Sequence, residues 1–157
     1  MSDECLFGLD LRAYLAGSWQ IERQIKDRRT GRMTSFYGQA EFEAADDVAL
    51  DYSENGWLDT GTRTLKASQR YHWSFDEGGA GVWFADGRPF HRVVIAYGAA
   101  SAQHDCPPDL YRVAYAFEAA HHWRQTWHVT GPRKDYTLES LFTRLHRAPV
   151  PVQSPPK

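Results

Sequence analysis

From Gly17 onward, mostly apolar residues alternate with mostly polar residues at a period of two, as residues 19–25 and 36–43 show. Successive side chains of a β-strand point to opposite faces, so this pattern predicts strands with one buried face. About ten such segments follow at spacings of roughly 8–15 residues, and turn-forming pairs such as Asp86-Gly87 separate them. This pattern predicts an all-β protein.

One segment departs from the period of two. Residues 9–16 predict a short helix, because Leu11, Tyr14 and Leu15 share one face at helical spacing. A single helix followed by a continuous meander favours one antiparallel up-and-down β-barrel of 8–10 strands. We expect this barrel domain to span residues 1–148, with a proline-rich disordered tail at 149–157.

The composition of the chain limits the kinds of partner that the protein can bind. The net charge of -2 argues against nucleic-acid binding, and no apolar run reaches the ~18–20 residues of a membrane span. The acidic start lacks the features of a signal peptide, and Cys5 and Cys106 form no disulfide framework. We therefore expect a cytoplasmic protein without membrane contact; its oligomeric state stays open.

Three consecutive predicted strands carry polar groups on the same face as large aromatic rings. On the first strand this face carries His104 and Cys106. On the second it carries every other residue from Asp109 to Phe117, and on the third every other residue from Trp123 to Val129. A buried polar group needs a partner, so a plain core would not require these residues. The pattern predicts an internal cavity, with a void of a few hundred Å³, that holds a small molecule.

We expect this molecule to be amphipathic or aromatic and to carry an anionic group that arginines hold. For Arg23, an internal ion pair with Glu54 or Asp135 is an equal alternative. The candidate ligand-binding residues are Arg23, Gln69, Tyr71, Arg88, His91, His104, Cys106, Tyr111, Tyr115, Trp123, Gln125, Trp127 and Arg133.

Two alternatives use the same cavity. An enzyme, such as an isomerase, cyclase or hydrolase, would act through His104, Asp109 and Tyr111 as catalytic residues. A structural role for Asp109 and Tyr111 at the adjacent turn competes with this hypothesis, and the question of catalysis stays open. A haem or metal carrier is the other alternative; no cofactor is favoured and no metal site is assigned.

The run Leu15-Ala16-Gly17-Ser18-Trp19, where the helix meets the first strand, resembles the Gly-x-Trp opening of the lipocalin or calycin superfamily. In that superfamily an arginine of the last strand commonly packs over the tryptophan. The resemblance implies that Arg144 or Arg147 covers Trp19.

Three further runs resemble an uncharacterised bacterial family that is catalogued as a domain of unknown function. They are residues 84–91, residues 104–113 and the run Gly131-Pro132-Arg133-Lys134-Asp135-Tyr136. The likeness extends from about Leu11 to Arg147. It implies a single barrel domain and brings no assigned activity.

Overall fold

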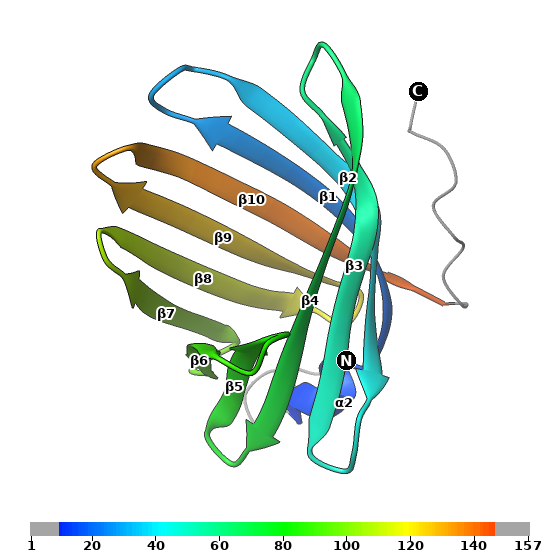
Figure 1. Ribbon diagram of the computed structural model, residues 1–157. Helices are drawn as coiled ribbons and strands as arrows, with labels where there is room; N and C mark the ends of the chain where they lie inside the picture. Colours follow the sequence, from blue (N-terminus) through cyan, green and yellow to red (C-terminus); the bar gives the residue numbers. More distant parts are fainter. Residues whose placement is uncertain (1–9, 147–157) are drawn as a thin grey trace.

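The computed structural model describes residues 10–146 of the chain. They form a short helix and ten antiparallel strands in a nearly closed barrel (Figure 1). The elements are α2 (Leu11–Leu15), β1 (Gly17–Asp27), β2 (Met33–Ala44), β3 (Ala49–Asp59), β4 (Thr64–Asp76), β5 (Gly79–Phe84), β6 (Pro89–Val94), β7 (Ala99–Cys106), β8 (Asp109–Ala119), β9 (His122–Gly131) and β10 (Lys134–Leu145). The predicted all-β barrel is confirmed, and the tail predicted at 149–157 lies outside the described residues.

The strands follow one another around the barrel in the order β6-β5-β4-β3-β2-β1-β10-β9-β8-β7. The first strand pairs with β2 on one side and with β10 on the other. The order therefore begins and ends at β6 and β7, which are consecutive in the chain, and an isolated bridge between Ala96 and Ala99 lies at their connection. This is the up-and-down meander that the sequence predicts, with its seam between β6 and β7.

The helix α2 lies at the end of the barrel where β1 begins and β10 ends (Figure 1). The side chain of Asp10 accepts a hydrogen bond from the backbone N–H of Ala13 at 3.1 Å and so caps the first turn. Leu11, Tyr14 and Leu15 are buried, as their spacing predicts. The helix is shorter than the predicted 9–16, and no helix within residues 10–146 is long and apolar enough to span a lipid bilayer.

Trp19 is fully buried at this end, beside the helix. Its indole N–H donates to the backbone carbonyl of Leu15 at 2.8 Å, and the guanidinium of Arg144 lies over its ring. The arrangement that the Gly-x-Trp resemblance implies is present with Arg144, whereas Arg147 lies outside the described residues. The helix, Trp19 and Arg144 together close this end of the barrel.

Candidate functional site

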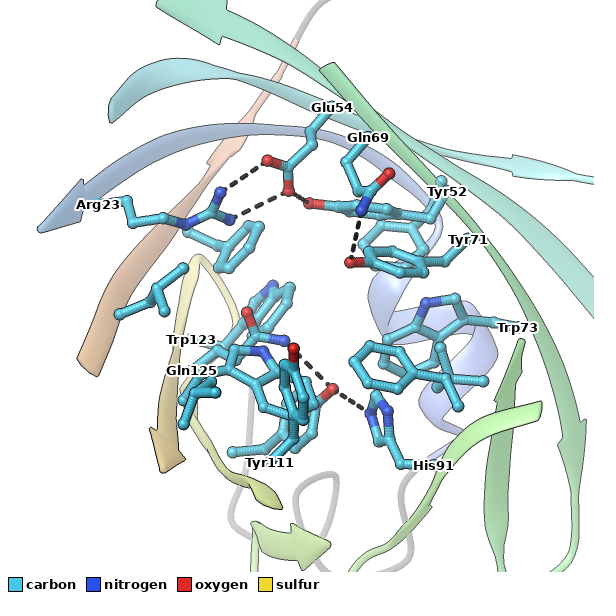
Figure 2. A pocket seen from close by; sticks show the side chains of 18 of the residues that line it. Arg23, Tyr52, Glu54, Gln69, Tyr71, Trp73, His91, Tyr111, Trp123 and Gln125 are labelled. Atoms are coloured by element: carbon cyan, nitrogen blue, oxygen red, sulfur yellow. Dashed lines mark hydrogen bonds and ion pairs between the residues drawn. The ribbon is translucent and has the colours of Figure 1, made fainter. Parts of the chain in front are cut away.

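A cavity of about 270 Å³ lies inside the barrel (Figure 2). Its volume is slightly below the low end of the ~300–1,000 Å³ usual for small-molecule sites. The lining residues are Arg23, Phe42, Tyr52, Glu54, Gln69, Tyr71, Trp73, Val82, Phe90, His91, Tyr111, Tyr115, Trp123, Gln125, Trp127, Val129, Tyr136, Leu138 and Phe142.

Stacked aromatic rings form much of the cavity wall. Phe90 lies parallel to Trp127 at 5.0 Å between ring centroids, and Tyr71 stacks on Phe90 at 5.5 Å. Deeper in the barrel, Trp123 lies flat against Phe142 at 3.8 Å. Flat rings that already pack face to face present a surface that suits a planar ligand.

A β-bulge places two consecutive residues of β6 in this wall. Val82 of β5 pairs with His91, but the next residue, Trp83, pairs with Pro89, so Phe90 is the extra residue. A bulge redirects side chains that regular alternation would send to opposite faces. Phe90 and His91 therefore both line the cavity.

A buried ion pair occupies one side of the cavity (Figure 2). Two nitrogens of the Arg23 guanidinium donate to the carboxylate of Glu54 at 2.7 and 3.1 Å, and its Nε donates to the hydroxyl of Ser140 at 2.7 Å. The Tyr52 hydroxyl donates to the same carboxylate at 2.5 Å. Burial alone would lower the pKa of Arg23, but hydrogen bonding and the charge of Glu54 outweigh it, so the pKa of Arg23 is raised and its guanidinium stays charged.

Two glycines make room for this ion pair. Gly38 of β2 and Gly56 of β3 are directly opposite each other, and the ring of Phe36 covers both. A Cβ at Gly56 would lie 2.6 Å from the Phe36 ring and 2.3 Å from the backbone oxygen of Tyr37. Because neither glycine has a side chain, Phe36 lies flat and the Arg23 guanidinium rests 5.0 Å above its ring.

A chain of three polar side chains occupies the other side. The amide nitrogen of Gln125 donates to the Tyr115 hydroxyl at 3.2 Å, and that hydroxyl lies 2.7 Å from Nε2 of His91. Burial, with a smaller contribution from His104, lowers the pKa of His91 to about 4. His91 is therefore neutral near pH 7. Burial also raises the pKa of Tyr115, so its hydroxyl stays protonated.

Three lining residues carry a buried ring nitrogen without a hydrogen-bond partner among the described residues. These atoms are Nε1 of Trp73, Nε1 of Trp123 and Nδ1 of His91. An unpaired buried polar atom costs about 1–3 kcal/mol, so native proteins usually pair it with protein, water or ligand.

The structure places nine of the predicted ligand-binding residues around the cavity. They are Arg23, Gln69, Tyr71, His91, Tyr111, Tyr115, Trp123, Gln125 and Trp127. The parity of β8 and β9 that the sequence predicts is correct, since Val113, Tyr115, Trp123 and Val129 are all buried. For Arg23, the alternative of an ion pair with Glu54 is the one that forms.

The remaining four candidates lie outside the cavity, which corrects their expected position. Arg88 is exposed and pairs with Asp86 at 2.8 Å in its own turn, and Cys106 is an exposed free thiol. Arg133 is exposed in the turn between β9 and β10. His104 is half-buried and packs edge-on against Phe84, Phe90 and Tyr111.

Two of the proposed catalytic residues meet, since His104 packs edge-on against Tyr111, but Asp109 binds elsewhere. Asp109 pairs with Lys134 at 2.9 Å, and that ammonium group lies 5.9 Å above the Tyr111 ring. These contacts join Asp109 and Tyr111 of β8 to Lys134 of β10. Within residues 10–146, no three His, Cys, Asp or Glu side chains converge as metal ligands would.

Several lining residues escaped the sequence reasoning. Tyr52 and Glu54 continue the period of two that starts at Leu50, so extending that strand would have found them. Tyr136, Leu138 and Phe142 line the cavity from β10. The alternation of β10 predicts that these three side chains point into the barrel. It does not predict how close they lie to the cavity, because that depends on the pairing of β10 with β9 and β1.

Comparisons with known proteins agree with this architecture. A family model described as a family of unknown function (DUF6314) matches residues 15–144. No curated protein matches the sequence. Among solved structures, the S-type phycobiliprotein lyase CPES from Guillardia theta is 14% identical with a TM-score of 0.61, covering 91% of each chain. A DUF3598 protein of unknown function from Nostoc punctiforme PCC 73102 is also 14% identical, with a TM-score of 0.57, over 84% of this chain and 47% of that one.

Proposed function

This chain belongs to the DUF6314 family of unknown function, and we propose that its barrel binds a small, planar, largely apolar molecule in the central cavity. The observation that carries the proposal is the void of about 270 Å³ that remains between stacked aromatic walls. A protein interior is close-packed unless the space has a use, so a void of this size favours a ligand. The likeness to the lyase supports the barrel fold alone.

The charges inside the cavity favour an uncharged ligand over the anionic one that the sequence suggested. Arg23 is the cation among the lining residues, and the carboxylate of Glu54 neutralises it with two hydrogen bonds. Arg88 and Arg133, the other arginines expected to hold an anion, lie outside the cavity. An anionic ligand would have to displace Glu54 from Arg23 and leave a carboxylate buried without its partner.

A fluorescent aromatic amine tests the proposal. N-phenyl-1-naphthylamine is uncharged and brightens in apolar surroundings, so we expect saturable enhancement at one site per chain. Leu138→Trp should weaken this binding at least about tenfold, because Leu138 lines the cavity and a larger side chain there fills it. Thr143→Trp is the matched control, since Thr143 is exposed on the same strand and should leave the affinity unchanged.

Two results would contradict the proposal: absence of saturable binding, or equal affinity in the two tryptophan variants. Native mass spectrometry of the purified protein gives a second test. A co-purified small molecule that is lost in Leu138→Trp and kept in Thr143→Trp would support occupancy of the cavity.

A further inference from the structure

We infer that the open end of the barrel docks on an anionic lipid surface, so that an apolar ligand can pass between the bilayer and the cavity. The inference goes beyond the proposed function, because docking itself needs no ligand. Three features of this end carry it: the barrel interior opens there, its turns are basic, and apolar side chains lie exposed among the basic ones.

The interior of the barrel becomes more exposed with distance from α2. On β4, the inward-facing side chains run from Trp73, which is 3% exposed, through the half-buried Tyr71 to Leu65, which is 38% exposed. On β1, Ile21 is fully buried, whereas Ile25 is half-buried one turn of the pleat further on. Figure 1 shows the turns that follow β1, β3, β7 and β9 at this end, opposite α2. The barrel therefore opens at these four turns.

The four turns at the open end are basic, although the whole chain has a net charge of -2. Together they hold eight lysines and arginines against five aspartates. These turns, with their flanking residues, are 26–33, 59–66, 105–109 and 131–135.

The turns at the opposite end are acidic. Residues 43–49, 76–79 and 118–122 hold six acidic side chains and no lysine or arginine. Two of these six, Asp76 and Glu118, pair with arginines of neighbouring strands. The charges of the protein are thus separated along the barrel, so an anionic surface would attract the open end more strongly than the other.

Most of the cations at the open end are free. Lys134 is held by Asp109, and Arg29 donates to the backbone carbonyl of Arg133. A free cation close to an anionic membrane contributes about 1 kcal/mol to binding, so several together support reversible adsorption. The basic side chains that are exposed and form no ion pair within residues 10–146 include Lys26, Arg28, Arg32, Arg63, Lys66 and Arg133.

Apolar side chains lie exposed between these cations. Met33 follows Arg32 at the start of β2 and is 50% exposed. Leu65 precedes Lys66 at the start of β4. Burial of apolar area at the boundary of a bilayer adds to the electrostatic attraction. A nucleic acid or an acidic protein segment would gain little from Met33 and Leu65, so the combination favours a lipid surface.

Docking in this orientation places the open end of the barrel against the lipid. An uncharged planar compound of the kind proposed above prefers an apolar phase to water. Transfer through the open end would spare it a passage through water. The sequence-based expectation of no membrane contact rests on spanning segments, and adsorption to a surface requires none.

Co-sedimentation with lipid vesicles tests the inference on the wild-type protein. We expect binding to phosphatidylcholine vesicles that contain about 30% phosphatidylglycerol, and no binding to vesicles of phosphatidylcholine alone. Salt at about 0.5 M should weaken the binding at least about tenfold, because it shortens the Debye length. Absence of binding, or equal binding to the two kinds of vesicle, would overturn the inference.

Charge variants locate the docking face. Arg32→Glu replaces a free cation of the open end by an anion and should weaken binding to the anionic vesicles about tenfold or more. Arg70→Glu is the matched control, because Arg70 is exposed in the middle of β4 and forms no ion pair among the described residues. It makes the same change of charge and should alter the affinity less than about twofold. Equal losses would show attraction by total charge and would defeat docking through the open end.

A second pair of variants tests the lipid contact. Met33 and Val48 are 50% and 54% exposed, but Val48 lies in the turn between β2 and β3 at the opposite end. Met33→Ser should weaken binding about threefold or more, whereas Val48→Ser should leave it unchanged. Equal affinities of these two variants, or tighter binding to a DNA duplex than to the vesicles, would overturn lipid as the partner. These measurements involve no ligand, so their failure would leave the proposed function of the cavity standing.

Discussion

The guanidinium of Arg144 lies 4.2 Å above the centre of the Trp19 ring, and the two residues are also direct partners in the pairing of β1 with β10. Arg144 donates to three backbone carbonyls, those of Tyr14, Ala16 and Ala120. One side chain thus joins the end of α2, the turn between β8 and β9, and the closed end of the barrel. Trp19 fills the space beneath it with no exposed surface.

Arg144→Lys should destabilise the protein by about 1–3 kcal/mol, although it keeps the charge. A single ammonium nitrogen cannot reach three carbonyls in different segments, so some of them lose their donor. Urea unfolding measures the change. Arg124→Lys is the control because Arg124 forms an exposed pair with Glu118, and it should change the free energy of unfolding by less than about 0.5 kcal/mol.

Trp19→Ala should cost about 3–5 kcal/mol, the usual range for truncating a buried large aromatic residue. Arg124→Ala, on the outer face of β9, should cost less than about 0.5 kcal/mol. Thermal and urea melts of both variants compare the two faces of the barrel wall. Similar losses would mean that the strands are out of register by one residue, because such a slip exchanges their faces.

The fold was predictable because alternation determines which face of each strand is buried. The period of two at residues 19–25 predicts β1, and the spacing of Leu11, Tyr14 and Leu15 predicts α2. The seam between β6 and β7 was not predictable in the same way. It depends on which strands pair across the barrel, and the short β6 carries no local signal for that choice.

The sequence predicts the site only where the alternation of a strand shows which side chains point into the barrel. Tyr111, Tyr115, Gln125 and Trp127 lie at the cavity because their strand faces point inward. His104 shares an inward face as well, but the rings of Phe84 and Phe90 pack against it, and this contact depends on a bulge in another strand. The partner of Arg23 was open between two acids, because only the pairing of β1, β2 and β3 brings Glu54 within reach.

The Arg23–Glu54 pair should show strong coupling between its two members. Glu54→Gln leaves the Arg23 charge buried without its counter-ion and should cost about 3–5 kcal/mol. The double variant Arg23→Met, Glu54→Leu removes both charges and should lie within about 2 kcal/mol of the wild type. Urea unfolding of the single and double variants gives the coupling energy. Additive losses would show that the two side chains do not depend on each other for burial.

The buried His91 should make stability fall with acid. Its pKa is about 4 in the folded protein against 6.5 in the unfolded chain, so the unfolded state binds a proton first as the pH falls. The penalty is absent above about pH 6.5, grows by about 1.4 kcal/mol per pH unit, and levels off below about pH 4. The groups that contact the ring are Tyr115, Phe90 and Trp127, and the charge of the nearby His104 lowers the pKa of His91 further.

His91→Phe isolates this contribution. Carboxylates also titrate between pH 6.5 and 4, but they do so in both proteins, so the difference between the two stability curves reports His91. We expect the wild type to lose up to about 3 kcal/mol more than His91→Phe across this range, as measured by urea unfolding at closely spaced pH values. Parallel curves would mean that His91 gains its proton as easily inside the barrel as in the unfolded chain. Burial of the ring would then not favour its neutral form.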